Sequence, residues 1–238
     1  PGLRLGGAGV AGETVKSEAI CLSVRPWSQT SHVVAWLTPR GKVGTVVKGA
    51  VRPKSFFLGQ YDLNYTCEIL YYGRARGDLH ALRDCVPLSR RDDLRTDYRA
   101  LVLAGYFRRL AADYAPTGPD CGAWYGLLSD ALDALAGGGA PDVGRLLRFE
   151  LDALHLLGLA PEIEAASGVF QLRGERTIPV SRAVAAYLRN PGQNSCDPQI
   201  PLDAARVIGV FYHFHLDCAP DVRRTVLALI SKTKESTR

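Results

Sequence analysis

The feature that most constrains this chain is a change in its hydrophobic periodicity close to residue 90. From Lys16 to Pro87, apolar and polar residues alternate with a period close to two, which is typical of strands with one buried and one solvated face. From Arg90 onward, apolar residues recur at helical spacing. A chain with its strands in one part and its helices in another folds as an α+β protein.

The first part of the chain predicts five strands. Their expected ranges are Lys16–Val24, His32–Thr38, Lys42–Lys48, Tyr61–Tyr71 and Asp78–Val86. Pro39-Arg40-Gly41 predicts a hairpin turn between the second and third strands, and Arg25 to Ser31 is expected to be a loop. Five strands in about seventy residues fit a small closed barrel such as the OB-fold, and an SH3-like barrel is the alternative that periodicity leaves open.

The remainder predicts a helical bundle and a small C-terminal mixed segment. Asp93 is expected to cap a helix that ends near Tyr114. Further helices are predicted at 121–136, 141–158, 180–189, 202–217 and 220–230, with a hairpin at 171–177. We therefore expect a flexible tail at 1–15, an OB-fold barrel at 16–88, a helical domain at 89–159, a short segment at 160–180 and, at 181–238, helices that pack on the bundle.

The positive charge of the chain is concentrated in the strand-rich part. Residues 1–90 carry 12 Lys and Arg against 6 Asp and Glu, whereas residues 91–238 carry 17 against 18. Clustered positive charge suits a polyanion, because each phosphate that is neutralised releases condensed counterions. The alternative is a basic face that is merely solvated.

The basic residues are interleaved with aromatic ones. Lys and Arg side chains would neutralise phosphates, while exposed Trp27, Phe56 or Phe57 would stack on unpaired bases. Phe56 and Phe57 could instead plug the mouth of the barrel, and aromatic residues within predicted strands, such as Trp36, are expected in the core. The candidate DNA-binding residues are Arg25, Trp27, Arg40, Lys42, Lys48, Arg52, Lys54, Arg74 and Arg76.

The sequence predicts a binding protein rather than an enzyme. It contains no G-x-x-x-x-G-K-[ST], H-E-x-x-H or G-x-S-x-G motif. Gly7, Gly9 and Gly12 satisfy G-x-G-x-x-G, but a dinucleotide site needs a strand before the glycines and a helix after them. His215 and Cys218 could share a ligand on one helix, although a packed helix end is favoured. We expect no cofactor and no metal.

Cysteine usage and hydropathy indicate a cytoplasmic protein. The six cysteines form no C-x-x-C pair, and most lie in apolar runs, which predicts buried, reduced thiols. No run approaches the length needed to span a bilayer, and the Gly-rich start lacks the order of a signal peptide. We expect a nucleoid-associated cytoplasmic protein with no membrane partner.

Several sequence blocks resemble a known family. They are Val24-Arg25-Pro26-Trp27-Ser28-Gln29-Thr30-Ser31, Leu37-Thr38-Pro39-Arg40-Gly41-Lys42-Val43, Val47-Lys48-Gly49-Ala50-Val51-Arg52-Pro53-Lys54-Ser55 and Leu154-His155-Leu156-Leu157-Gly158-Leu159-Ala160-Pro161. The first three blocks look like the opening of the bacterial recombination mediators of the RecO family. The fourth is similar to a helix end that leads into the zinc-binding segment of that family.

The resemblance implies an N-terminal OB-fold, a central helical bundle and a non-enzymatic protein that binds single- and double-stranded DNA. Members of the family anneal complementary strands and help load RecA onto DNA coated by single-strand-binding protein. They work with RecR in the RecF pathway, which repairs gaps and breaks after DNA damage. The matching positions that would contact phosphates are Arg25, Arg40, Lys42, Lys48, Arg52 and Lys54.

The chain departs from the family pattern in one segment. Many members place four cysteines after the Gly-x-Ala-Pro block, whereas residues 162–180 contain none. We expect hydrophobic packing, rather than zinc, to hold that segment together. An alternative function for the whole chain is a protein adaptor whose basic barrel steers its partners electrostatically without binding DNA.

Overall fold

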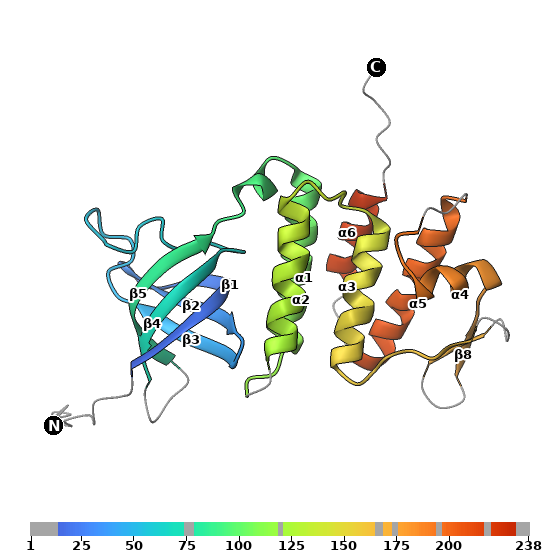
Figure 1. The fold of residues 1–238 in the computed structure, drawn as a ribbon, viewed down its shortest axis with the longest axis horizontal. Helices are drawn as coiled ribbons and strands as arrows, with labels where there is room; N and C mark the ends of the chain where they lie inside the picture. Colours follow the sequence, from blue (N-terminus) through green and yellow to red (C-terminus); the bar gives the residue numbers. More distant parts are fainter. Residues whose placement is uncertain are drawn as a thin grey trace, which may run out of the picture. The chain divides into compact units, whose positions relative to one another are not determined.

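The structure, a computed structural model, describes residues 14–73, 79–118, 121–164, 169–172, 176–193, 197–216 and 220–231. The chain divides into two compact units. The barrel unit contains Pro1–Arg90 and Ala115–Tyr125, and the helical unit contains Arg91–Tyr114 and Gly126–Arg238. Figure 1 shows the strands of the first unit curled into a barrel and the helices that make up most of the second.

Five strands form the barrel. They are β1 (Thr14–Ser28), β2 (Ser31–Thr38), β3 (Gly41–Val47), β4 (Thr66–Tyr72) and β5 (Leu79–Ser89). The barrel closes in the order β1-β2-β3-β5-β4, and β4 pairs back with β1. The contact of β3 with β5 is parallel and is made by three residue pairs, from Gly44↔Leu79 to Val46↔Ala81. This five-stranded closed barrel followed by helices and a small sheet confirms the predicted OB-fold and α+β class.

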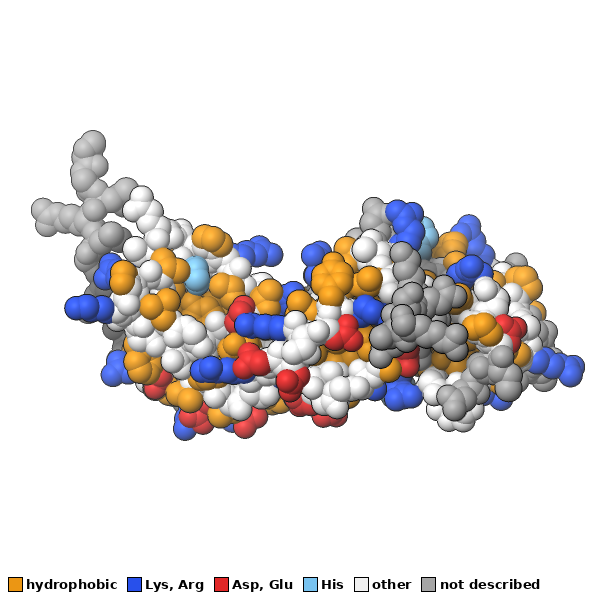
Figure 2. All heavy atoms as spheres, turned by 90° about the horizontal axis from the view of Figure 1, so that it is seen from above, with side chains coloured by type: hydrophobic (Ala, Val, Ile, Leu, Met, Phe, Trp, Pro, Cys, Tyr) orange, Lys and Arg blue, Asp and Glu red, His pale blue; other side chains and the backbone are white. Residues whose placement is uncertain are grey.

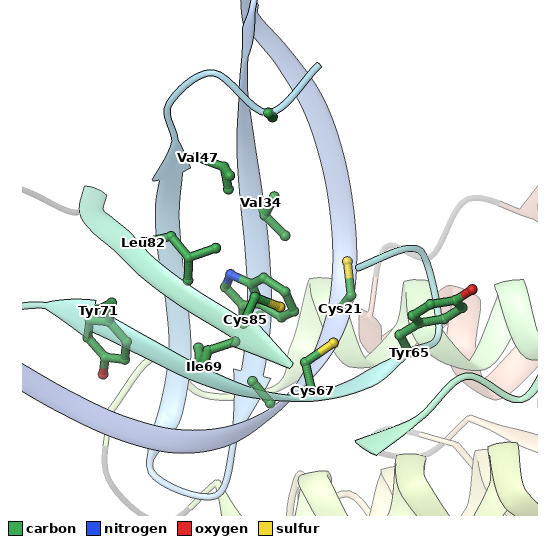
Figure 3. Close-up of a cluster of buried hydrophobic side chains, with 12 residues drawn as sticks. Cys21, Val34, Val47, Tyr65, Cys67, Ile69, Tyr71, Leu82 and Cys85 are labelled. Atoms are coloured by element: carbon green, nitrogen blue, oxygen red, sulfur yellow. The ribbon is translucent and has the colours of Figure 1, made fainter. Parts of the chain in front are cut away.

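All five strands contribute to the interior of the barrel, as Figure 3 shows for Cys21, Val34, Val47, Ile69 and Leu82. The interior is almost wholly apolar. A fully buried hydrogen bond joins the indole N–H of Trp36 to Thr45 Oγ1 at 2.8 Å. The prediction that Trp36 lies in the core is therefore confirmed.

Three thiols share this interior. Cys21, Cys67 and Cys85 are buried, and the Sγ atoms of Cys67 and Cys85 lie 3.5 and 3.7 Å from the carbonyl oxygen of Gln60. A hydrogen bond with Cys67 and burial both raise the pKa of the Cys85 thiol, so it is not a reactive thiolate. The predicted burial of the cysteines is confirmed at these positions and at Cys121. Cys196 and Cys218 lie outside the described residues.

The predicted loop from Arg25 to Ser31 is wrong over its first half, because β1 continues to Ser28. Its pairing with β2 shifts register twice, and the second shift lies between Pro26 and Ser28. Such irregularities bend a strand and allow a proline, which cannot donate a ladder hydrogen bond, to remain in the sheet.

The alternating stretch that begins at Tyr61 predicted a long fourth strand, but β4 begins only at Thr66. Asn64 has a left-handed φ of 67°, which asparagine tolerates better than most residues, and the Tyr65 N–H donates to Asp62 O at 3.1 Å. The chain therefore turns here. Tyr61 and Tyr65 still pack on the barrel core, whereas Leu63 is 40% exposed.

Thr117 and Gly118 of the barrel unit lie against the β2–β3 turn. A Cβ atom added to Gly41 would lie 2.9 Å from the carbonyl oxygens of both Thr117 and Gly118, and Gly41 has a φ of +137°. Tyr125 also donates its hydroxyl to Glu18 Oε2 at 3.1 Å. Glycine is therefore required at position 41 by backbone conformation and by space.

The helical elements are α1 (Tyr98–Tyr114), α2 (Gly122–Ala136), α3 (Val143–Leu156), α4 (Arg182–Arg189), α5 (Gln199–Leu216) and α6 (Pro220–Ile230). The predicted cap Asp93 instead belongs to a 3-10 turn, Asp92–Arg95. Asp97 Oδ1 accepts the backbone N–H of Arg99 at 2.8 Å and so caps α1. No helix in the described part of the chain is long and apolar enough to cross a membrane.

The segment without cysteines forms a small antiparallel sheet of β6 (Ile163–Glu164), β7 (Val169–Gln171) and β8 (Thr177–Pro179). Phe170 of β7 is fully buried, and its ring contacts Phe211 edge-on at a centroid distance of 5.6 Å. This aromatic contact confirms the predicted hydrophobic packing. Residues 162–180 offer no thiolate ligand, so they do not fit the structural zinc that the resemblance would imply.

The helical unit buries an ion pair in its core. Arg223 donates to Glu150 through Nε at 2.7 Å and through Nη2 at 2.8 Å, and Glu150 is 0% exposed. Tyr106 donates to the same carboxylate at 2.6 Å, and Tyr212 donates to the Glu150 carbonyl at 2.9 Å. Burial and the Glu150 charge raise the pKa of Tyr106. Four helices, α1, α3, α5 and α6, thus meet at one buried glutamate.

Candidate nucleic-acid interface

Strand alternation sends the first candidate residues outward. Val24 of β1 packs on the barrel core, so Arg25 points to the outer face. Trp27 lies at the register shift between Pro26 and Ser28, and it is 63% exposed. A largely exposed tryptophan beside an exposed arginine provides a flat ring and a positive charge on one surface.

The chain brings further candidates to this end of the barrel. The Gly49 N–H donates to Ser31 Oγ, and the Val51 N–H donates to Thr30 O, both at 3.3 Å. These bonds hold the segment that follows β3 against the turn that joins β1 to β2. Lys48 and Arg52, which flank the bonded residues, are therefore placed at the same end of the barrel as Trp27. We call Arg25, Trp27, Lys48, Arg52, Lys54 and Phe56 the turn-side surface.

Arg40 and Lys42 lie elsewhere on the barrel. They belong to the turn between β2 and β3 and to the first residues of β3, with Lys42 opposite Leu37. Because β2 has 8 residues, its two ends are about 23 Å apart at ~3.3 Å per residue. The structure therefore divides the predicted residues into two groups rather than a single cluster. Arg74 and Arg76 lie outside the described residues.

The two adjacent phenylalanines have different environments. Phe57 packs against the barrel core, as the plug interpretation predicted, whereas Phe56 is 65% exposed. Their rings meet edge-on at 5.9 Å. Val51 and Leu58 in the same segment are 46% and 49% exposed, and we did not predict them as surface residues. No periodic pattern marks them, because the segment consists of successive turns.

The cations of the turn-side surface are unpaired in the described structure. Arg25, Lys48, Arg52 and Lys54 are exposed and form no ion pair with a described residue. Lys16 provides a contrast, because its Nζ lies 2.9 Å from Glu68 Oε1. Figure 2 shows Lys and Arg side chains interspersed with exposed hydrophobic side chains on the visible face of the barrel. Unpaired, solvated cations remain available for phosphates.

No group of three His, Cys, Asp or Glu side chains that could hold a metal ion occurs within the described ranges. His215 stacks on Phe211 with a centroid distance of 4.2 Å, and His213 is exposed on the same helix. Cys218, the partner considered for His215, lies outside the described residues. His215 is therefore placed by aromatic packing.

Comparison with known proteins identifies two family matches that follow one another along the chain. Residues 13–91 match the family described as Recombination protein O N terminal, and residues 95–223 match Recombination protein O C terminal. The first match covers the barrel strands and the second covers most of the helical elements.

Individual relatives agree with these matches. A DNA repair protein RecO of Moorella thermoacetica is 30% identical over 176 residues, which is 73% of this chain and 64% of the relative. The RecO protein of Roseiflexus sp. is 30% identical over 62% of this chain and 51% of its own length, and that of Geobacter metallireducens is 30% identical over 61% and 59%. The matched parts thus span about half to two thirds of these relatives. The chain belongs to the RecO family of recombination proteins.

Proposed function

We propose that this chain is a non-enzymatic DNA-binding mediator of recombination and DNA repair. It binds single- and double-stranded DNA through the barrel, anneals complementary strands and assists RecA loading on DNA coated by single-strand-binding protein. RecR is its expected partner in the RecF pathway. Membership of the RecO family supports this role, and the relatives are named DNA repair protein RecO.

The observation that carries the proposal is the turn-side surface. It combines four exposed cations that pair with no described residue and two rings, Trp27 and Phe56, that are 63% and 65% exposed. The cations bind phosphates without regard to sequence, and each ring stacks on any unpaired base. Annealing follows because two strands whose phosphates are neutralised on one surface repel each other less.

The proposal is tested by titrating a labelled single-stranded oligonucleotide against the protein at several salt concentrations, with fluorescence anisotropy as the readout. Replacing both Arg52 and Lys54 with alanine removes two phosphate contacts. The slope of log K against log salt should therefore fall by about 1.4, at ~0.7 per contact on a single strand. Trp27→Ala should weaken binding by about 1–3 kcal/mol and leave the salt slope nearly unchanged.

Lys16→Ala is the matched control, because Lys16 is a barrel cation that is already paired with Glu68. It should leave both affinity and salt slope close to wild type. If the Arg52 and Lys54 variant also keeps the wild-type slope, the turn-side surface is not the binding site. If the wild-type protein binds no DNA even at low salt, the adaptor function replaces the mediator function.

A further inference from the structure

A second group of cations and an exposed aromatic ring lies at the other end of the barrel from the turn-side surface. Because β3 and β5 are parallel, Arg40, which directly precedes β3, lies at the same end as the start of β5 and the end of β4. Burial raises the pKa of Tyr71, and the Arg40 charge opposes this rise, so the guanidinium lies near the end of β4. We call Arg40, Tyr72 and Arg83 the far-end surface.

A β-bulge turns Arg83 outward. The register shift between Leu70 and Tyr71 of β4 leaves Arg83 as the extra residue of β5, with no residue opposite it on β4. Bulges recur at the rims of barrels and next to functional sites, where they re-aim a side chain. Trp27 of the turn-side surface is likewise the residue that is skipped where β1 pairs with β2. Each surface therefore presents a side chain from a bulge.

Arg83 and Tyr72 form a pre-arranged pair. Arg83 Nη1 donates to the Tyr72 hydroxyl at 2.5 Å, and the guanidinium carbon lies 5.4 Å from the centroid of the tyrosine ring. Tyr72 is still 38% exposed, and Arg83 is exposed. A guanidinium that is already held on a ring loses less freedom when it binds a phosphate, and it keeps further N–H donors for that purpose.

The cations of the far-end surface are not neutralised within the described structure. Neither Arg40 nor Arg83 forms an ion pair with a described residue. Asp84 follows Arg83 directly, but its Oδ1 accepts the backbone N–H of Cys85 at 2.8 Å. The far-end surface therefore offers what the turn-side surface offers, namely exposed positive charge beside an exposed ring.

The surface between the two ends offers no cationic path that would join them into one site. β2 carries no Lys or Arg, and β3 carries none between Lys42 and Lys48. On β1 and β4, Glu18 lies directly opposite Glu68. Successive phosphates of one strand are ~3.4 Å apart, so a strand that followed the ~23 Å of β2 would place roughly six phosphates over uncharged surface. The two ends are therefore separate sites.

We propose that the far-end surface binds a second DNA strand, so that one barrel holds two strands at once. Arg40 and Arg83 contact the phosphates of this strand, and Tyr72 stacks on one of its unpaired bases. This inference rests on the proposed function and gives annealing a structural basis. Two strands that are held on one barrel meet at a high effective concentration.

The test counts the strands on one protein molecule. The full chain is mixed with an excess of short oligothymidine, which cannot pair with itself, and native mass spectrometry should detect one chain with two strands. Energy transfer between donor-labelled and acceptor-labelled oligothymidine reports the same complex in solution. The transfer should decline when protein is in excess, because the two strands then occupy different molecules.

Combining Arg40→Ala with Arg83→Ala removes two phosphate contacts from the far-end surface. The salt slope for binding of the second strand should fall by about 1.4, at ~0.7 per contact, while the first strand keeps its affinity on the turn-side surface. Tyr72→Ala should weaken the second strand about fivefold or more. Both variants should anneal complementary strands more slowly, and thermal unfolding checks that each is folded.

Lys16→Ala is the matched control, because it removes a barrel cation that is already paired with Glu68. It should bind two strands as the wild type does. The proposal is overturned, and the mediator function stands, if the wild-type chain binds only one strand, if two strands require two chains, or if the Arg40 and Arg83 variant binds the second strand unchanged. Binding of an oligoglutamate peptide in place of the second strand would assign the far-end surface to an acidic protein and would also overturn it. A wild-type chain that binds no DNA would remove both proposals.

Discussion

The two units of this protein stabilise their interiors by different means. The barrel interior is almost wholly apolar, with buried thiols and a buried hydrogen bond between Trp36 and Thr45. The helical unit instead buries Glu150, whose carboxylate accepts from Arg223 and Tyr106 and whose main-chain carbonyl accepts from Tyr212. In an apolar core, the stability lost on substitution scales with the side-chain volume that is removed. A buried charge that loses its partner instead remains unneutralised in a medium of low dielectric. The helical unit should therefore be more sensitive to a single substitution.

Breaking the buried ion pair gives the largest expected effect. Arg223→Ala or Glu150→Ala should lower the free energy of unfolding of the helical unit by about 3–5 kcal/mol, because either change leaves one buried charge unpaired. Chemical denaturation followed by circular dichroism measures this loss. Replacing both residues, with Glu150→Leu and Arg223→Met, should cost less than either single change.

The exposed pair of Arg109 and Asp113 serves as the control for that experiment. Its N–O distance is 2.6 Å, close to that of the buried pair, but its side chains are 64% and 43% exposed. Arg109→Ala should therefore cost at most about 0.5 kcal/mol. An equal loss for Arg109→Ala and Arg223→Ala would mean that burial does not distinguish the two pairs.

Gly41→Ala should produce the next largest loss of stability. This loss should be limited to the barrel unit. The positive φ and the carbonyl oxygens of Thr117 and Gly118 both oppose a Cβ atom, so we expect a loss of about 2–3 kcal/mol. Alkylation of Cys21, Cys67 and Cys85, detected by peptide mass spectrometry, reports opening of the barrel. Gly59→Ala is a useful comparison, because Gly59 also has a positive φ but no atom lies within 4 Å of the place that a Cβ would take.

Trp36→Phe tests the buried hydrogen bond in the barrel. It leaves the Thr45 hydroxyl, which is 0% exposed, without its indole donor, and about 1–3 kcal/mol of stability should be lost. Adding Thr45→Val removes the unsatisfied hydroxyl and should recover part of that loss. If the double variant is as unstable as the sum of the two single variants, the cost lies in packing rather than in the hydrogen bond.

The smallest effect concerns the start of α1. Asp97→Ala removes the side chain that accepts the Arg99 N–H, and we expect a loss of about 1 kcal/mol in the helical unit. Asp93→Ala should cost less than about 0.5 kcal/mol, because Asp93 caps no helix. Thermal unfolding compares the stabilities of the two variants directly. If Asp93→Ala loses more stability than Asp97→Ala, Asp93 is the helix cap, as the sequence predicted.

The sequence predicted the class of fold because alternation and helical spacing record which side chains face a core. The same rule failed from Tyr61 to Tyr65, where two tyrosines pack inward from a turn and imitate a strand. It also failed at Asp93, because two aspartates four residues apart precede the helix and local propensity does not choose between them. Turn geometry decides both cases, and it depends on contacts that are distant in the sequence.

The candidate interface was predicted in composition but not in arrangement. Charge and aromatic content indicated Arg25, Trp27 and Arg52 as candidate DNA-binding residues, and the structure shows that all three are exposed. The separation of Arg40 and Lys42 from them depends on the length of β2, and the different environments of Phe56 and Phe57 depend on how successive turns close the barrel. Neither follows from periodicity. The buried partner of Glu150 was likewise unpredictable, because 73 residues separate it from Arg223.

The parallel contact between β3 and β5 has a consequence for the rate of folding. Three residue pairs join Gly44–Val46 to Leu79–Ala81, so a long intervening chain must be ordered before a small number of bonds is gained. The antiparallel hairpin of β2 and β3, joined by a tight turn, can form early because its contacts are local. Closure between β3 and β5 is therefore the step expected to limit how fast the barrel assembles, and amides at this contact should be the first in the barrel to exchange with solvent.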